Sequence, residues 1–146
     1  MQANTSILPN FIVVGANKGG TTSIYHYLRQ HPEVYLSPVK EPHYFSKDID
    51  VDLFKREFAQ NKLQDIEKYV NGDMSEEYHA AFIRDETQYR KLFKNVKGEK
   101  AIGELSTSYL YSTVAASEIK KLVPNCKIII CLRNPIDRAY SHYRMN

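Results

Sequence analysis

Two apolar runs without polar alternation are the strongest features of the hydrophobic pattern. One run is Phe11–Val14, and the other lies within Lys127–Leu132. A strand that is covered on both faces shows such a run, because neither of its faces meets water. We therefore expect both segments to be buried strands of a parallel sheet, with a third, shorter strand at Val34–Leu36.

Helical spacing of apolar residues separates these strands. It predicts helices over residues 22–30, 52–58, 87–93 and 113–122. Asp85 or Thr87 is the expected N-cap of the third helix and Ser112 that of the fourth, because each side chain can accept a hydrogen bond from a backbone N–H group. A further helix should begin at Pro135, with Asn134 as its N-cap. Strands that alternate with helices indicate an α/β fold.

Composition bounds the size of the domain and the kind of partner. A chain of 146 residues with 42% hydrophobic content can form one core, so we expect a single domain over residues 1–146. The net charge of +3 is mild and the basic residues are dispersed. This favours an anionic small molecule as ligand, and neither nucleic acid nor a membrane surface.

The sequence also predicts where the protein works. The first ten residues lack the features of a signal peptide, and no apolar run approaches the roughly 20 residues of a membrane helix. Cys126 and Cys131 should point to opposite faces of one strand, so they cannot bridge each other. We therefore expect a reducing, cytoplasmic location.

The first apolar run ends in a glycine-rich loop, Gly-Ala-Asn-Lys-Gly-Gly-Thr-Thr-Ser over residues 15–23. Its glycines let the backbone approach a ligand closely, and Thr21, Thr22 and Ser23 open a helix whose free N–H groups attract an anion. A nucleotide triphosphatase loop carries its lysine directly before the hydroxyl residue, but here Thr21 stands there and Lys18 lies in the middle of the loop. Taken alone, the segment leaves open both an anion-binding loop and an ordinary glycine-rich turn with a solvated lysine.

A stiff loop with ionisable groups follows the strand at Val34–Leu36. Residues 40–45 read Lys-Glu-Pro-His-Tyr-Phe, and Pro38 precedes them. The prolines exclude a helix and fix the backbone, so Glu41 should sit on a rigid loop. That loop follows the second strand at the edge to which the first strand delivers Lys18, and open α/β sheets bind ligands at this edge. A loop glutamate is usually only solvated, but this position makes Glu41 a candidate site residue.

The second apolar run leads into Arg-Asn-Pro-Ile-Asp-Arg-Ala-Tyr-Ser, residues 133–141. The carboxyl end of the expected strand presents Arg133, and a guanidinium fork suits a terminal phosphate. The alternative interpretation is that Arg133 forms an ion pair on the surface. Ser141 lies about two helical turns further along, so spacing alone does not show whether it faces the same pocket.

In this order, the segments resemble the motifs of sulfotransferases of the carbohydrate-type or bacterial branch, which use 3′-phosphoadenosine 5′-phosphosulfate (PAPS). Residues 18–23 resemble the 5′-phosphosulfate loop, residues 40–45 resemble Lys-Glu-x-His-Phe-Phe, and residues 133–141 resemble the 3′-phosphate motif. Residues 104–109 resemble Glu-Lys-Ser-Pro-x-Tyr, with two departures. Leu105 replaces the lysine and Thr107 replaces the proline of heparan-type members. If that lysine holds the sulfonate being transferred, its absence argues against a heparan-like acceptor.

The resemblance implies a P-loop-type three-layer α/β fold around a central parallel sheet, and an enzyme that transfers a sulfonate group from PAPS to an acceptor hydroxyl. Lys18 would stabilise the leaving group and Glu41 would act as general base, without a metal. The resemblance also implies a set of donor-binding residues: Lys18, Gly19, Gly20, Thr21, Thr22, Ser23, Arg133 and Ser141. The acceptor is expected to be a carbohydrate or a small molecule, and the sequence does not identify it.

The resemblance covers the amino-terminal half of such an enzyme, because family members continue for roughly as long again. We therefore expect the domain to be incomplete at its carboxyl terminus and to expose apolar surface. Such a chain should self-associate or be completed by a second chain. Two other functions remain open: a non-catalytic nucleotide-binding fragment, and a P-loop kinase or NTPase.

Overall fold

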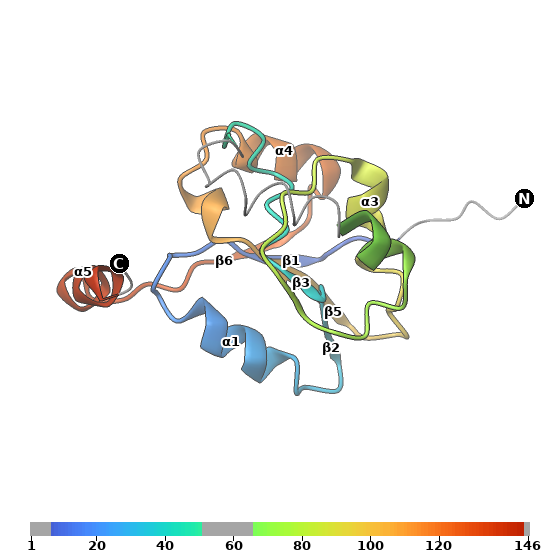
Figure 1. The fold of residues 1–146 in the computed structure, drawn as a ribbon, viewed down its shortest axis with the longest axis horizontal. Helices are drawn as coiled ribbons and strands as arrows, with labels where there is room; N and C mark the ends of the chain where they lie inside the picture. The colour runs from blue at the N-terminus through green and yellow to red at the C-terminus, as the bar shows by residue number, and fades with distance from the viewer. Residues whose placement is uncertain (1–6, 51–65, 145–146) are drawn as a thin grey trace, which may run out of the picture.

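A four-stranded parallel sheet forms the centre of the computed structural model, which describes residues 7–50 and 66–144 (Figure 1). The strand order is β2-β5-β1-β6, and every neighbouring pair runs parallel. The strands are β1 (Phe11–Val13), β2 (Val34–Leu36), β5 (Ala101–Leu105) and β6 (Lys127–Ile129). The predicted α/β fold with a central parallel sheet is confirmed.

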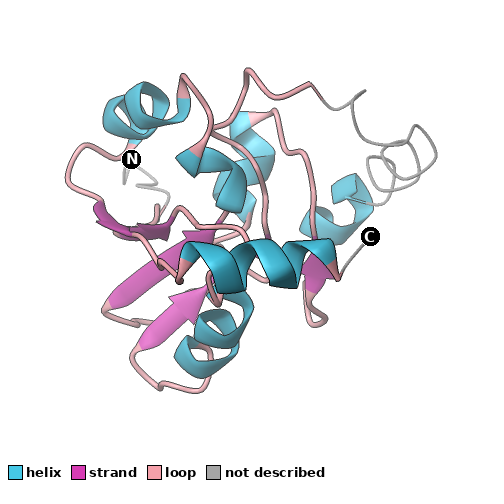
Figure 2. Ribbon diagram, turned by 90° about the vertical axis from the view of Figure 1, so that its left-hand side faces the viewer, coloured by secondary structure: helices cyan, strands magenta, loops and turns pink. Residues whose placement is uncertain are grey.

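Helices lie on both sides of this sheet (Figure 2). In Figure 1, α1 lies on one side and α3 and α4 lie on the other, while α5 extends away from the body of the molecule. The helices are α1 (Thr21–Leu28), α3 (Glu86–Lys91), the 3-10 helix η2 (Thr107–Leu110), α4 (Ala115–Leu122) and α5 (Pro135–Tyr143), and residues 66–71 are also helical. None of the described helices has the length and apolar character needed to cross a membrane.

Strand β1 is buried on both faces, as its unbroken apolar run predicts. Phe11 and Val13 pack in a cluster with Tyr25 of α1. Ile12, on the opposite face, belongs to a larger cluster that includes Ile119 of α4. Ile12 and Val13 are both 0% exposed. The sheet therefore has a separate apolar layer on each side, which gives three layers.

Capping residues place the helix starts close to their predicted positions. Asp85 Oδ1 accepts a hydrogen bond from the backbone N–H of Gln88 at 2.8 Å, so it caps α3 as expected. The prediction that Ser112 is the N-cap of the fourth helix is wrong, because α4 begins at Ala115 with Val114 as its N-cap; Ser112 Oγ still accepts from the backbone N–H of Ala115 at 3.0 Å. Asn134 caps α5 by accepting from the N–H of Ile136. The helix predicted over residues 52–58 lies outside the described residues.

The prediction that Lys127–Leu132 is a buried strand is wrong in two respects. The strand β6 ends at Ile129, and its residues are exposed. Ile128 is 47% exposed and Ile130 is 50% exposed. The physical reason is position: β6 is an edge strand of the described sheet and pairs with β1 alone. The apolar run favours burial, but no other segment among the described residues covers it.

A second, two-stranded parallel sheet holds the loop that carries Glu41. It pairs β3 (Val39–Lys40) with β4 (Tyr78–His79), so that Lys40 stands opposite His79. Backbone bonds continue past the strands, because Ala81 N donates to Glu41 O at 3.0 Å. The sequence gives no indication of this pairing, which brings residues from the middle of the chain to the loop.

Candidate active site

One cleft of about 320 Å³ collects most of the predicted site residues. It lies where the loops after β1, β3 and β6 meet, which is the ligand-binding edge expected of an open α/β sheet. Its lining residues are Asn17, Lys18, Gly20, Thr21, Thr22, Lys40, Glu41, His79, Arg133 and Ser141. Of the predicted residues, Gly19 and Ser23 are not among them.

Gly19 serves the packing of the loop instead of lining the cleft. A Cβ atom at this position would lie 2.4 Å from the carbonyl oxygen of Cys131. The loop and the segment after β6 are also bonded to each other, because Ala16 N donates to Cys131 O at 2.8 Å and Cys131 N donates to Gly15 O at 2.7 Å. These contacts fix the Lys18 loop beside the segment that leads to Arg133.

The cleft meets the start of helix α1. The helix begins at Thr21, and its first turn contains no acidic residue. The first N–H groups of an α-helix have no intrahelical acceptor and stand at the positive end of the helix dipole. Because Thr21 and Thr22 line the cleft, this end of α1 can bind an anionic group there.

Glu41 is held from several sides. Its Oε2 accepts a hydrogen bond from Thr107 Oγ1 at 2.8 Å. Lys40 Nζ lies 3.8 Å from Oε1, and His43 Nε2 lies 3.6 Å from Oε2. The backbone N–H of Glu41 donates to Leu105 O at 2.9 Å. The side chain is 16% exposed, so the carboxylate is oriented but still reachable from the cleft.

Left-handed backbone conformations cluster at the cleft. Lys18 has a φ of 62°, Glu41 of 65° and His43 of 52°. Ala80, directly after the cleft residue His79, has a φ of 59°. Such conformations are unfavourable for residues other than glycine and persist where the surrounding structure imposes them, often at functional sites. The two side chains predicted to be catalytic, Lys18 and Glu41, both sit on such backbone.

His43 is buried and electrically neutral at neutral pH. Burial lowers the pKa of its imidazole to about 4, against the opposing influence of Glu41. Its Nδ1 lies 2.7 Å from Ser108 Oγ, and its ring stacks on Phe82 with a centroid distance of 4.7 Å. Arg84 NH1 donates to the carbonyl oxygen of His43 at 2.6 Å. The imidazole therefore supports the Glu41 loop without adding positive charge to it.

A buried carboxyl group lies beneath this loop. Glu104 is 0% exposed, and burial raises its pKa to about 7 although hydrogen bonds lower it. Its Oε1 accepts from Tyr109 OH at 2.8 Å and from Tyr89 OH at 3.1 Å, and its Oε2 accepts from Ser106 Oγ at 3.0 Å. Ser106 Oγ in turn accepts from the backbone N–H of His43 at 3.1 Å. Glu104 thus anchors the loop from inside the core.

The two departures from the Glu-Lys-Ser-Pro-x-Tyr pattern have different structural meanings. Leu105 is 1% exposed and packs in the apolar cluster below α1, so it lies in the core. Thr107 hydrogen-bonds the Glu41 carboxylate, which gives the departure a role in orienting the candidate base. Among the described residues that line the cleft, the second lysine is Lys40.

Arg133 and Ser141 face the same cleft, which spacing alone could not show. Asn134 and Pro135 start α5 directly after Arg133. Sequence reasoning missed His79 and Thr107. The only signal for Thr107 was its place in a motif, and nothing in the chain marks His79, because the β3–β4 pairing that brings it to the cleft joins distant segments.

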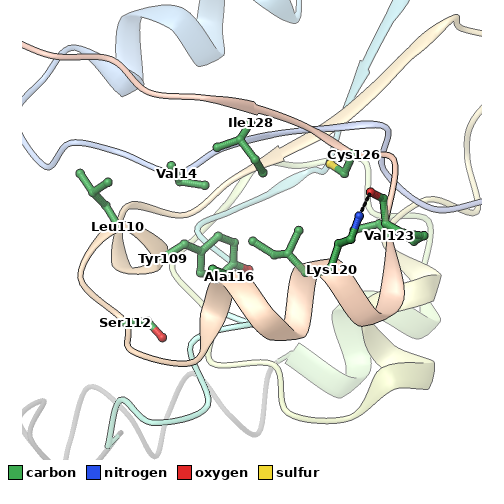
Figure 3. Close-up of a pocket in the computed structure, with 11 residues that line it drawn as sticks. Val14, Tyr109, Leu110, Ser112, Ala116, Lys120, Val123, Cys126 and Ile128 are labelled. Atoms are coloured by element: carbon green, nitrogen blue, oxygen red, sulfur yellow. Dashed lines mark hydrogen bonds between the residues drawn. The ribbon is translucent and has the colours of Figure 1, made fainter.

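A second hollow is apolar and contains none of the predicted site residues. It has a volume of about 370 Å³ and lies between α4 and the strands β1 and β6 (Figure 3). Figure 3 shows Val14 and Ile128 above it and Ala116 of α4 below, with Lys120 donating a hydrogen bond to the Pro124 carbonyl oxygen. Among the described residues that line this hollow, Lys120 is the one charged residue and most of the others are apolar, so the hollow offers an anion less positive charge than the other cleft.

Known proteins are similar in sequence to this protein over almost its whole chain. The model of the Sulfotransferase family matches residues 9–146. Membrane-associated sulfotransferase kil1 of Dictyostelium discoideum is 30% identical over 139 residues, which are 95% of this chain and 23% of that protein. Carbohydrate sulfotransferase 15 of Mus musculus is 28% identical over 151 residues, which cover 93% of this chain and 27% of that protein.

A solved structure shares the fold. The crystal structure of a sulfotransferase from Alicyclobacillus acidocaldarius matches with a TM-score of 0.73 and 38% sequence identity. The match covers 95% of this chain and 50% of that chain. The chain thus spans half of the solved relative and about a quarter of the two curated relatives.

Proposed function

The chain belongs to the sulfotransferase family, and we propose that it carries the donor site and the general base of an enzyme that transfers a sulfonate group from PAPS to an acceptor hydroxyl. The observation that carries this proposal is that four of the predicted site residues line the same cleft. Lys18, Glu41, Arg133 and Ser141 come from three separate segments of the chain, and all four line it.

The charge of the cleft fits a donor with an anionic group at each end. Among the described residues that line it, Lys18, Lys40 and Arg133 carry positive charge and Glu41 carries the one carboxylate. Lysine ammonium and arginine guanidinium groups both bind phosphate, and arginine can bind it through two parallel hydrogen bonds. When bound, PAPS would supply the sulfonate group to be transferred, together with the 3′-phosphate for which we propose Arg133 and Ser141 as ligands.

Sulfonate transfer resembles phosphoryl transfer, in which positioning and charge stabilisation do most of the catalysis. Lys18 and the N–H groups at the start of α1 would stabilise the charge that grows on the departing phosphate oxygen. Glu41 would take the proton of the acceptor hydroxyl while that oxygen bonds to sulfur and the bond from sulfur to the phosphate oxygen breaks. We assign the charge stabilisation to these side chains and propose no metal.

The acceptor belongs to the same proposal. We propose a carbohydrate or small-molecule hydroxyl, since one relative is named a carbohydrate sulfotransferase. We also propose a reducing, cytoplasmic compartment, because Cys126 and Cys131 are free thiols that pack against different apolar clusters.

Release of 3′-phosphoadenosine 5′-phosphate (PAP) from PAPS tests the proposed function. The protein should release PAP in the presence of a suitable hydroxyl acceptor, and Lys18→Ala should slow that release about 100-fold or more because it removes transition-state charge stabilisation. Lys100→Ala is the matched control, since Lys100 is an exposed lysine that pairs with Glu33. Equal rates for the Lys18→Ala and Lys100→Ala variants would contradict the role of Lys18.

A further inference from the structure

Lys40 is a buried cation that nevertheless lines the cleft. Its side chain is 2% exposed, and it lies at the end of β3, directly before Glu41. Burial of a charged side chain is unfavourable unless other groups compensate the charge and occupy its hydrogen-bonding atoms. The residues around the Lys40 ammonium therefore show which of its hydrogen-bond donors still need an acceptor.

The described residues satisfy the Lys40 ammonium only in part. An ammonium group carries three N–H donors. Among the described residues, its one hydrogen-bond partner is His79, with Nζ and Nε2 3.3 Å apart. The nearest carboxylate oxygen, Glu41 Oε1, is 3.8 Å away, which is an ion-pair distance and too long for a hydrogen bond. No described residue accepts a hydrogen bond from the other two donors, so an acceptor bound in the cleft can occupy them.

The position of Lys40 identifies the kind of acceptor. Glu41 Oε2 is already bonded to Thr107 Oγ1, which fixes the carboxylate beside the ammonium. A group transferred from the Lys18 loop to a hydroxyl activated by Glu41 must pass next to Glu41. Lys40 stands there, within 3.8 Å of the carboxylate. An oxygen atom of the transferred group can therefore approach the Lys40 ammonium.

We propose that Lys40, oriented by His79, forms an oxyanion subsite that binds a non-bridging sulfonate oxygen of PAPS beside Glu41. This inference rests on the proposed function and deepens it, because it adds a second cation to the reacting centre. Lys18 would stabilise the charge on the departing phosphate, and Lys40 would bind an oxygen of the sulfonate itself. His79 is a positioning residue: it stands opposite Lys40 in the β3–β4 ladder, and its Nε2 holds the ammonium in place.

Calorimetric binding of PAPS and of PAP to the protein separates this subsite from the rest of the donor site. PAP lacks the sulfonate group, so Lys40→Met should weaken PAPS binding about tenfold or more while changing PAP binding much less. Lys40→Arg, which keeps the charge, should retain part of the preference for PAPS. Lys100→Met removes an exposed lysine away from the cleft and should change neither affinity.

His79→Ala gives an independent test, because His79 is exposed and the substitution leaves no cavity in the core. Like Lys40→Met, it should reduce the preference for PAPS over PAP, but by a smaller factor. Equal losses of PAPS and PAP binding in Lys40→Met, or an unchanged preference in His79→Ala, would overturn the subsite and leave the donor site standing. Failure of the unmodified protein to bind either nucleotide would overturn the proposed function as well.

Discussion

Glu41 is the residue on which the proposed proton transfer depends. Glu41→Gln keeps the shape of the side chain and an oxygen that Thr107 can reach, but an amide cannot accept the proton. Turnover should therefore fall roughly 100-fold or more, while the affinity for PAP stays nearly unchanged. Steady-state rates and calorimetry on the same variant measure the two quantities. Unaltered turnover would move the role of base to His43, whose neutral imidazole lies 3.6 Å from Glu41 Oε2.

Glu104 should make the stability of the protein depend on pH. Its pKa is about 7 in the folded protein and near 4.5 in the unfolded chain. Between these two pH values, Glu104 binds more protons in the folded protein than in the unfolded chain. As pH rises through this range, Glu104 therefore lowers the free energy of unfolding by about 3 kcal/mol in all. Glu104→Gln cannot ionise, so its stability relative to the unmodified protein should increase from about pH 4.5 to pH 7.

His43 makes the free energy of unfolding change with pH in the opposite direction to Glu104. The test therefore uses the difference in that free energy between the unmodified protein and Glu104→Gln. The folded pKa of His43, about 4, lies below the ordinary value of 6.5, so its contribution to stability is lost as pH falls through that range. Urea unfolding of both proteins at each pH, with the free energies subtracted, removes the contribution of His43. A difference that is constant between pH 5 and pH 8 would show that Glu104 does not have a raised pKa.

Sequence motifs can identify a residue but not always its neighbours. Lys18, Glu41 and Arg133 were predictable because each follows a strand, and strands of a parallel sheet end at one edge. His79 was not predictable, because the pairing of β3 with β4 joins segments about 40 positions apart without any local pattern. The role of Thr107 was hidden for a similar reason: its hydroxyl reaches Glu41 only after β5 and the Glu41 loop come together.

Strand β5 has a glycine at the position where it pairs with Phe11 of β1. A Cβ atom at Gly103 would lie 2.3–2.5 Å from ring atoms of Phe11, which is paired with it across the sheet. Gly103→Ala should therefore destabilise the protein by about 1–3 kcal/mol, since overpacking displaces a buried ring. Gly72→Ala is the control, because its new Cβ would meet neighbours at an ordinary 3.4 Å. Equal thermal stability of the two variants would contradict this packing.

Helix starts were predicted better than the burial of the strands. A cap needs one side chain and one backbone N–H a few residues away, so the N-caps Asp85 and Asn134 could be identified locally. Burial needs a neighbour from elsewhere in the fold. The apolar runs of β1 and β6 are alike in sequence, yet β1 lies between two strands and β6 lies at an edge.

The molecule as a whole exposes a large apolar surface on β6, the segment after it and α5. Its exposed apolar residues are Ile128, Ile129, Ile130, Leu132, Ile136, Tyr140 and Tyr143. Exposed apolar patches of several hundred Å² and unpaired strand edges both promote association. We expect the chain to self-associate with rising concentration, as sedimentation velocity would show.

Substitution within that surface tests its part in association. The double change Ile128→Thr and Ile130→Thr should weaken self-association while keeping strand-forming residues in place. Tyr27→Ser removes an exposed apolar side chain from α1, where Tyr27 is 72% exposed, and should leave association unchanged. A concentration-independent monomer for the unmodified chain would contradict the expectation.

Nucleotide preference tests the central claim most directly, because it needs neither an acceptor nor turnover. The cleft is lined by Lys18, Thr21, Arg133 and Ser141, and the proposed function assigns Lys18 and the start of α1 to a 5′ group and Arg133 and Ser141 to a 3′-phosphate. Calorimetry should therefore show PAP binding well ahead of AMP and of ATP with magnesium, and Arg133→Ala should weaken PAP binding more than AMP binding. Tighter binding of ATP with magnesium than of PAP would contradict the account.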